Sequence, residues 1–203
     1  MTTNESFPKF DLPVDFIADD SITGDILNYY GNFPCKIKAG VFVLCTEGMV
    51  RATINLLEIV IRKNDFIVVL PNSFIQIHEV SSDTRISFAG FSSDFMLSGN
   101  YVEILLDFMP MILNSPVISL QEDVAGLYRN VYLLLIRAYT LPHSLENKEI
   151  IRSVLAIFLQ GTKELYKRYG KKLDEPLRRE QELYRQFIQL LICLLYTSPS
   201  PRD

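Results

Sequence analysis

Residues 40–78 read GVFVLCTEGMVRATINLLEIVIRKNDFIVVLPNSFIQIH, and this stretch decides the fold class. Short runs rich in Val, Ile and Phe alternate with turn-forming residues at Gly48, Asn64-Asp65 and Pro71-Asn72. Such runs, bounded by Gly, Pro, Asn and Asp, are typical of β-strands. The predicted strands are Gly40–Glu47, Val50–Ile61 with a tight turn near Asn55–Glu58, Asp65–Leu70 and Phe74–Val80.

The same pattern extends outward on both sides, from about Asp25 to Phe91. A strand is expected at Asp25–Tyr30 before the quoted stretch and another at Arg85–Phe91 after it. Short, evenly spaced strands with no helical segment between them favour a barrel or sandwich over alternating strands and helices. We expect a compact all-β region.

After Ser92 the apolar residues recur with helical period instead. This period predicts helices at Tyr101–Leu113, Glu122–Tyr139 and Ser144–Tyr169, with Gly170 ending the third. A further helix is expected at Glu180–Ile192, beyond a charged connector. Strands followed by helices indicate an α+β protein.

The composition excludes several classes of protein. The chain has 203 residues, of which 48% are hydrophobic and 22% charged, so it can bury a core and is not a disordered chain. Its formal net charge of −4 provides no general attraction to nucleic acid. Met1–Ser6 has neither the basic nor the apolar part of a secretion signal, and no stretch is apolar enough to span a membrane. We expect a cytoplasmic protein that does not bind membranes.

The residues that usually carry chemistry are scarce. The three cysteines, Cys35, Cys45 and Cys193, form no CxxC pair, and the two histidines, His78 and His143, are too few for a histidine-based metal site. Neither a nucleophile elbow nor a phosphate-binding glycine loop is present. We expect no catalytic residues, no metal and no cofactor, and therefore no enzyme.

Basic residues concentrate late in the chain, but acidic residues are interleaved with them. This pattern indicates a solvated helix face and linker, with contact to a DNA backbone as the alternative. The basic residues are Lys163, Lys167, Arg168, Lys171, Lys172, Arg178, Arg179 and Arg185.

The stretch Gly40–His78 resembles the cupin sensor of AraC/XylS-type bacterial transcriptional regulators. The shared features are a strand ending in Glu47-Gly48, a hairpin with alternating apolar positions, Asn64-Asp65 where the family commonly has Gly-Asp, then an apolar strand, Pro71 and a short strand with His78. The sequence departs from metal-binding cupins, since it has Cys35 and Ile37 in place of a histidine pair, and Ile75 or Gln76 where a ligand histidine would follow Pro71.

This resemblance implies a cupin-like (jelly-roll, RmlC-type) antiparallel β-barrel followed by a C-terminal helical dimerisation segment. It implies a homodimer, a small-molecule effector, and DNA binding only through a C-terminal domain that this chain lacks. The implied parts are an N-terminal arm (1–24), the barrel (25–92), the helical dimerisation region (93–170), and a linker with the start of the DNA-binding domain (171–192). Leu183–Ile192 resembles the helix that opens that domain.

The last eleven residues, Cys193–Asp203, read CLLYTSPSPRD and break off an amphipathic helix in mid-turn. They resemble the translation of a transposase-based sequencing adapter. We therefore interpret residues 193–203 as an artefact and expect the natural protein to continue past about Ile192; a genuine tail is the alternative.

Two sets of residues are candidates for function. If the barrel binds an effector, strand alternation suggests that its wall includes Val41, Val43, Cys45, Thr53, Gln76, His78 and Phe88. If the third helix dimerises, its apolar residues Ile150, Val154, Phe158 and Leu165 are the expected interface. Simple filling of a solid barrel and packing within one chain are the respective alternatives.

The function that these observations favour is the effector-sensing and dimerisation region of an AraC-type regulator. Two other functions stay open. A small cupin enzyme would need converging acid, base or metal ligands, and a stand-alone, metal-free cupin-like protein would bind a small molecule or carbohydrate.

Overall fold

The computed structural model describes residues 9–10, 12, 14–29, 31, 33–97, 101–140 and 148–169, and the single residues 179, 183, 186, 187 and 190. It is an α+β fold with two five-stranded sheets. Sheet A has the order β1 (Lys9–Phe10), β3 (Cys35–Ile37), β8 (Ser73–Val80), β5 (Met49–Ile54) and β6 (Leu57–Arg62). Sheet B has the order β10 (Val117–Ser119), β7 (Asp65–Val69), β4 (Gly40–Glu47), β9 (Arg85–Phe91) and β2 (Phe16–Thr23).

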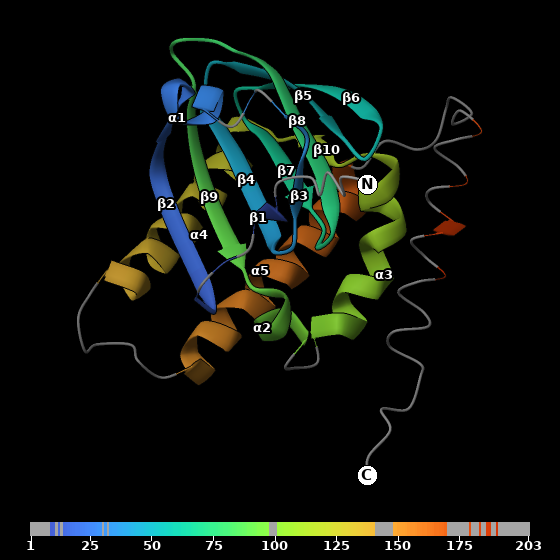
Figure 1. Cartoon of the computed structure of the whole chain (residues 1–203). Helices are drawn as coiled ribbons and strands as arrows, with labels where there is room; N and C mark the ends of the chain where they lie inside the picture. Colours follow the sequence, from blue (N-terminus) through green and yellow to red (C-terminus); the bar gives the residue numbers. More distant parts are fainter. Residues whose placement is uncertain are drawn as a thin grey trace, which may run out of the picture.

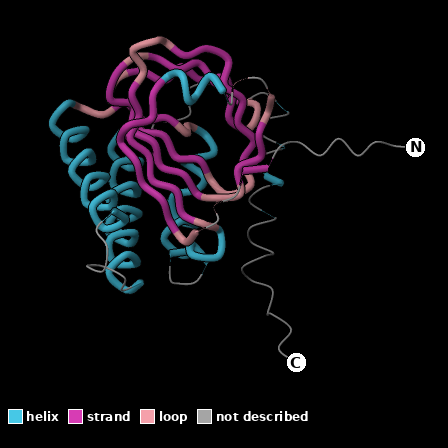
Figure 2. The backbone as a smooth tube through the Cα atoms, turned by 60° about the vertical axis from the view of Figure 1, so that its left-hand side comes forward, coloured by secondary structure: helices cyan, strands magenta, loops and turns pink. Residues whose placement is uncertain are grey.

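The long helices gather on one side of this sandwich. The short helices are α1 (Gly24–Tyr29) and α2 (Ser93–Leu97), and the long ones are α3 (Tyr101–Asn114), α4 (Glu122–Thr140) and α5 (Lys148–Tyr169). Figure 1 shows the long helices against sheet B, with α4 on β2 and β9 and α5 beside α3 and β10. Figure 2, from another side, shows long helices lined up beside the layered strands.

Residues in the left-handed region mark the corners where the chain passes from one sheet to the other. Gly48, with φ of 77°, joins β4 to β5, while Asn64 and Asn72, each with φ of 67°, join β6 to β7 and β7 to β8. Glycine is needed at the first corner, because a Cβ on Gly48 would lie 2.6 Å from the Cα of Thr84. Asparagine tolerates this conformation better than most residues.

Two separate cores follow from this layering. One lies between sheet B and the helices and is rich in aromatic rings, such as Phe42, Phe66 and Phe158. The other lies between the two sheets and holds smaller side chains, such as Val50, Ile67 and Ile86. Sheet B is therefore covered on both faces, which explains why its central strands read as nearly continuous apolar runs.

The structure corrects three expectations. The closed barrel is wrong: within the described residues the two sheets share no strand, because the chain turns between them at tight corners. The predicted strand at Asp25–Tyr30 is helix α1, with Asp25 favourably placed in its first turn. Strand β2, paired with β9 in sheet B, lies inside the stretch 1–24 that was expected to be an arm.

The remaining predictions of secondary structure agree closely. The strands at Gly40–Glu47 and Arg85–Phe91 are confirmed, and the tight turn near Asn55 joins β5 and β6 as a two-residue hairpin, with Ile54 paired to Leu57. Helices α3 and α4 differ from the prediction by one residue at their ends. Residues 141–147, where the third helix was expected to begin, lie outside the described part.

Candidate functional site

Four of the predicted wall residues face the space between the sheets. Val41, Val43, Cys45 and Phe88 all belong to the inter-sheet core, and Val43 pairs directly with Phe88 across β4 and β9. Their neighbours on β4, such as Phe42, point to the helices instead. The orientation predicted for Val41, Val43 and Cys45 is therefore the one observed, although whether they contact an effector stays a prediction.

The thiol of Cys45 is the one polar side chain of this group. It is fully buried, and its Sγ donates to the carbonyl oxygen of Glu47 at 3.2 Å. Burial, followed by the nearby charge of Asp65, raises the pKa of Cys45 to about 11. The thiol is therefore protonated at neutral pH and unsuited to nucleophilic attack.

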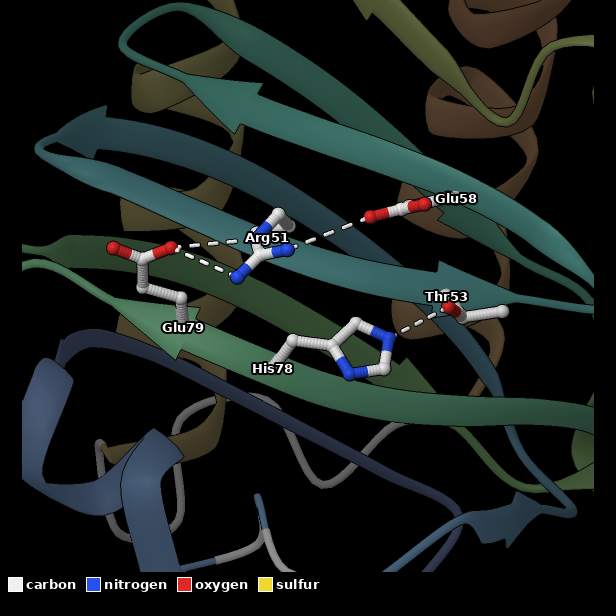
Figure 3. Close-up of polar contacts among 5 residues, drawn as sticks. All are labelled: Arg51, Thr53, Glu58, His78 and Glu79. Carbon is white, nitrogen blue, oxygen red and sulfur yellow. Dashed lines mark hydrogen bonds and ion pairs between the residues drawn. The ribbon is translucent and has the colours of Figure 1, made fainter.

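The other three predicted wall residues lie on the opposite face of sheet A. Thr53 and Gln76 are paired across β5 and β8, and His78 is exposed beside them. His78 Nε2 lies 2.7 Å from Thr53 Oγ1, as Figure 3 shows. These three side chains lie outside the interior that contains Val41. The prediction that all seven residues line one wall is therefore corrected.

A β-bulge explains part of this error. Arg51 pairs with Glu79 but the next residue, Ala52, pairs with Ile77, so His78 is an extra residue in β8. Because of the bulge, His78 and Glu79 are both exposed, and Val80 packs into the interior. Simple alternation would have placed His78 and Val80 on one face.

Charged residues continue this outer face of sheet A. Figure 3 shows Arg51 between two carboxylates, with its Nη2 3.2 Å from Glu79 Oε2 and its Nη1 3.6 Å from Glu58 Oε1. All three side chains are substantially exposed, so these ion pairs are screened by solvent and contribute little stability. The face is polar and solvated.

A small hollow lies at one end of the sandwich, where the β5–β6 hairpin meets the C-terminal part of α3. Its enclosed space is about 10 Å³, which is room for about one water molecule. Its lining is mostly apolar and consists of Ile54, Asn55, Leu57, Val68, Leu70, Ser73, Ile112, Leu113 and Pro116. The polar group of the hollow is a hydrogen-bonded pair, in which Asn55 Nδ2 donates to Ser73 Oγ at 2.9 Å.

None of the residues around this hollow was among the predicted site residues. The available signal was Asn55, because an Asn at a hairpin turn often takes a positive φ, and here φ is 48°. The contribution of α3 had no signal, since the hollow exists only where the helix reaches the hairpin.

The residues predicted for dimerisation lie on α5 but face the protein itself. Phe158 and Leu165 are 2% and 7% exposed within the helix-facing core, and Val154 packs against that core. These residues therefore pack within one chain, which was the alternative to a dimer interface. Ile150 is helical, but its side chain lies outside the described part. Among the described residues of the long helices, the exposed large apolar side chains are Met111 on α3, Leu127 and Leu134 on α4, and Ile157 on α5.

Among the described residues, no group of three or more His, Cys, Asp or Glu side chains could hold a metal ion. No described helix is long and apolar enough to cross a membrane. His143, Cys193 and nearly all of residues 171–192 lie outside the described residues.

No protein-family profile matches the chain, and no curated protein sequence matches it. Among solved structures it is similar to ToxT from Vibrio cholerae O395 bound to (E)-4-(8-methylnaphthalen-1-yl)but-3-enoic acid, with 12% identity over 92% of this chain and 73% of that chain, and a TM-score of 0.42. It is also similar to the AraC-like transcriptional activator CuxR, with 11% identity over 81% of this chain and 54% of that chain, and a TM-score of 0.45. Both similarities are distant, and they leave the family of the chain open.

Proposed function

We propose that this chain is the effector-sensing and dimerisation region of an AraC-type transcription regulator, with a cupin-like sandwich as its sensor. The complete protein would bind DNA sequence-specifically through a domain beyond Ile192. The observation that carries the proposal is the helical layer, because α3, α4 and α5 follow β9 in the chain and pack against sheet B, as the Gly40–His78 resemblance implies. The protein would act by binding, without catalysis, metal or cofactor, in the cytoplasm of a bacterium.

The effector would be a small apolar molecule with one hydrogen-bonding group. The lining of the hollow suits this chemistry, since apolar side chains surround the Asn55–Ser73 pair, but the hollow must open before it can hold an effector. Ile54 belongs both to the hollow and to the inter-sheet core, so an effector there could reach toward Val43 and Phe88 only by moving packed side chains. Binding would then favour one arrangement of sheet A and α3 over another, which a sensor requires.

Filling the hollow tests this proposal. A set of apolar molecules bearing one hydroxyl or amide group is screened by thermal shift, and the best binder is titrated against Leu113→Trp and against His78→Ala with Gln76→Ala. We expect the larger side chain to keep the hollow from opening for a ligand and so to abolish binding. The double alanine variant changes only the outer face of sheet A and should bind as the parent does.

Binding that survives Leu113→Trp would exclude the hollow as the effector site. Loss of binding in the double alanine variant would place the site on the outer face of sheet A. Circular dichroism of each variant confirms that the fold is retained.

The alternative function is a stand-alone, metal-free cupin-like protein that binds a small molecule or carbohydrate. The outer face of sheet A favours it, because Phe74 is 37% exposed beside the polar side chains of Gln76 and His78. A ring next to hydrogen-bonding groups suits a sugar. The two functions differ in whether the natural reading frame continues past Ile192.

A further inference from the structure

Strand β6 is an edge strand of sheet A. Among the described residues it pairs only with β5, and the pairing begins at the hairpin, where Ile54 is opposite Leu57. In a two-residue hairpin this first pair exchanges hydrogen bonds, and every second residue then repeats the pattern. Leu57, Ile59 and Ile61 therefore bond to β5.

The intervening residues of β6, Glu58, Val60 and Arg62, direct their backbone groups to the free edge. Their side chains lie on the outer face of sheet A: Val60 is 37% exposed, the Glu58 side chain is 67% exposed, and Arg62 is exposed. Only at Arg62 is the backbone N–H already used, as a donor to Asp65 Oδ2 at 2.7 Å. The free edge thus runs from Glu58 to the carbonyl of Arg62.

The sequence of β6, LEIVIR, is complementary to itself when two copies run antiparallel. With a two-fold axis at Val60, each Glu58 lies opposite Arg62 of the second copy, and Ile59 lies opposite Ile61. The charged pairs fall on the outer face and the isoleucines fall on the interior face, so both faces match. Opposite charges directly across two strands are stabilising, and like charges are destabilising.

We propose that β6 is the homodimer surface of this protein, pairing antiparallel with β6 of a second copy around a two-fold axis at Val60. The two five-stranded sheets A then become one continuous sheet across the dimer. The two Val60 residues exchange a pair of main-chain hydrogen bonds, and each Glu58 N–H donates to the carbonyl of Arg62 in the other copy. This inference rests on the homodimer of the proposed function and names its surface.

The charges on β6 favour pairing between two copies of this strand. They do not simply keep other strands away from the edge. Charged residues often guard an edge strand by repelling other strands. Here Glu58 and Arg62 have opposite signs and stand at equal distances from Val60, so self-pairing in this register brings attraction. Registers centred on Glu58 or on Arg62 would oppose like charges at the axis, so they are disfavoured. Glu58 is free to turn outward, because Arg51 keeps the closer contact with Glu79.

A cross-link locates the axis directly. Residues in a hydrogen-bonded antiparallel pair have Cα atoms about 5.5 Å apart, which a disulfide can span. Val60→Cys in the whole chain should therefore form a disulfide dimer under mild oxidation. Leu56→Cys is the matched control: it is exposed on the same hairpin but lies far from its own copy in this register. The parent chain controls for the native cysteines, and neither control should cross-link.

Charge reversal tests the register. Glu58→Arg alone and Arg62→Glu alone each oppose like charges at both ends of the strand pair, and should raise the dimer dissociation constant about tenfold or more. The double variant Glu58→Arg with Arg62→Glu restores both pairs and should dimerise as the parent does. Sedimentation velocity measures the dissociation constants, and circular dichroism verifies folding.

The outcomes separate this inference from the proposed function. A monomeric parent chain overturns the β6 dimer whatever lies beyond Ile192. The β6 dimer is also overturned if Val60→Cys does not cross-link the parent dimer and the double variant Leu127→Glu with Leu134→Glu dissociates it. That result would place the dimer surface on the exposed face of α4. Cross-linking at Val60 with rescue by the double charge variant establishes the β6 dimer, even if the natural gene encodes no DNA-binding domain.

Discussion

Replacing Phe158 with alanine measures what α5 does. The Phe158 ring is 2% exposed and meets four other rings. Its centroid lies 4.8 Å from that of Phe42 at 87°, 5.5 Å from Tyr132 at 80°, 5.7 Å from Tyr128 at 56° and 6.0 Å from Phe66 at 64°. These are edge-on and tilted contacts of the kind that stabilises beyond simple burial. The ring therefore joins α5 to both α4 and sheet B.

The expected loss of stability is large. Buried Phe→Ala substitutions cost about 3–5 kcal/mol, and the four aromatic neighbours place Phe158→Ala near about 4–5 kcal/mol. Total stability is about 5–15 kcal/mol for most domains, so the variant should be close to unfolding. Urea denaturation followed by circular dichroism gives the free energy of unfolding for the parent and the variant. Ile157→Ala, on an adjacent residue that is 67% exposed, is the control and should change stability by less than about 0.5 kcal/mol.

Measurements at two protein concentrations separate core packing from dimerisation. If Phe158 packs within one chain, the loss is the same at both concentrations; if it packs against a partner, the loss depends on concentration. A loss below about 1 kcal/mol for Phe158→Ala, or a folded variant that has simply become monomeric, would refute the placement of this ring in the intramolecular core.

Three further predictions use the same denaturation assay or simple chemistry. Leu56, at a hairpin position with φ of 71°, is strained, so Leu56→Gly should raise stability by up to about 1 kcal/mol, and an unchanged or lower stability would contradict that strain. Gly48→Ala should lower stability by at least about 1–2 kcal/mol, because φ is 77° and its Cβ would strike Thr84; a neutral result would mean that the corner can relax. The buried Cys45 thiol has its pKa raised from 9.0 to about 11, so between these pH values it stays protonated in the folded chain and ionises in the unfolded chain. Its contribution to the free energy of unfolding is therefore full below pH 9 and falls between pH 9 and 11. Cys45→Ser should flatten that part of the pH profile, and an equally steep profile in the variant would assign the loss to other groups.

Strands β4 and β7 of sheet B could be predicted because their residues leave little choice. Asp65–Val69 is buried throughout, between the helices and sheet A, so its apolar run marks a strand covered on both faces. On β4, alternation correctly separated Val41, Val43 and Cys45 from Phe42. Local pattern sufficed for them, because almost every position in β4 and β7 meets a core.

The candidate site could be predicted only in part, because its features depend on long-range contacts. The bulge at His78 reverses the expected relation between His78 and Val80, and it arises from pairing with β5, not from β8 alone. The period of α5 identified an apolar stripe but could not tell whether sheet B or a second copy covers Phe158. The hollow needed the position of Leu113 on α3 against Asn55 in a distant hairpin.

The measurement that tests the central claim most directly is the sequence of the natural gene beyond the codon for Ile192. We predict that Cys193–Asp203 is absent there and that the frame continues into two helix-turn-helix units, which would make this chain the sensor of a DNA-binding regulator. A stop codon directly after Ile192, or an in-frame continuation without those units, would contradict the regulator and leave a stand-alone binding protein.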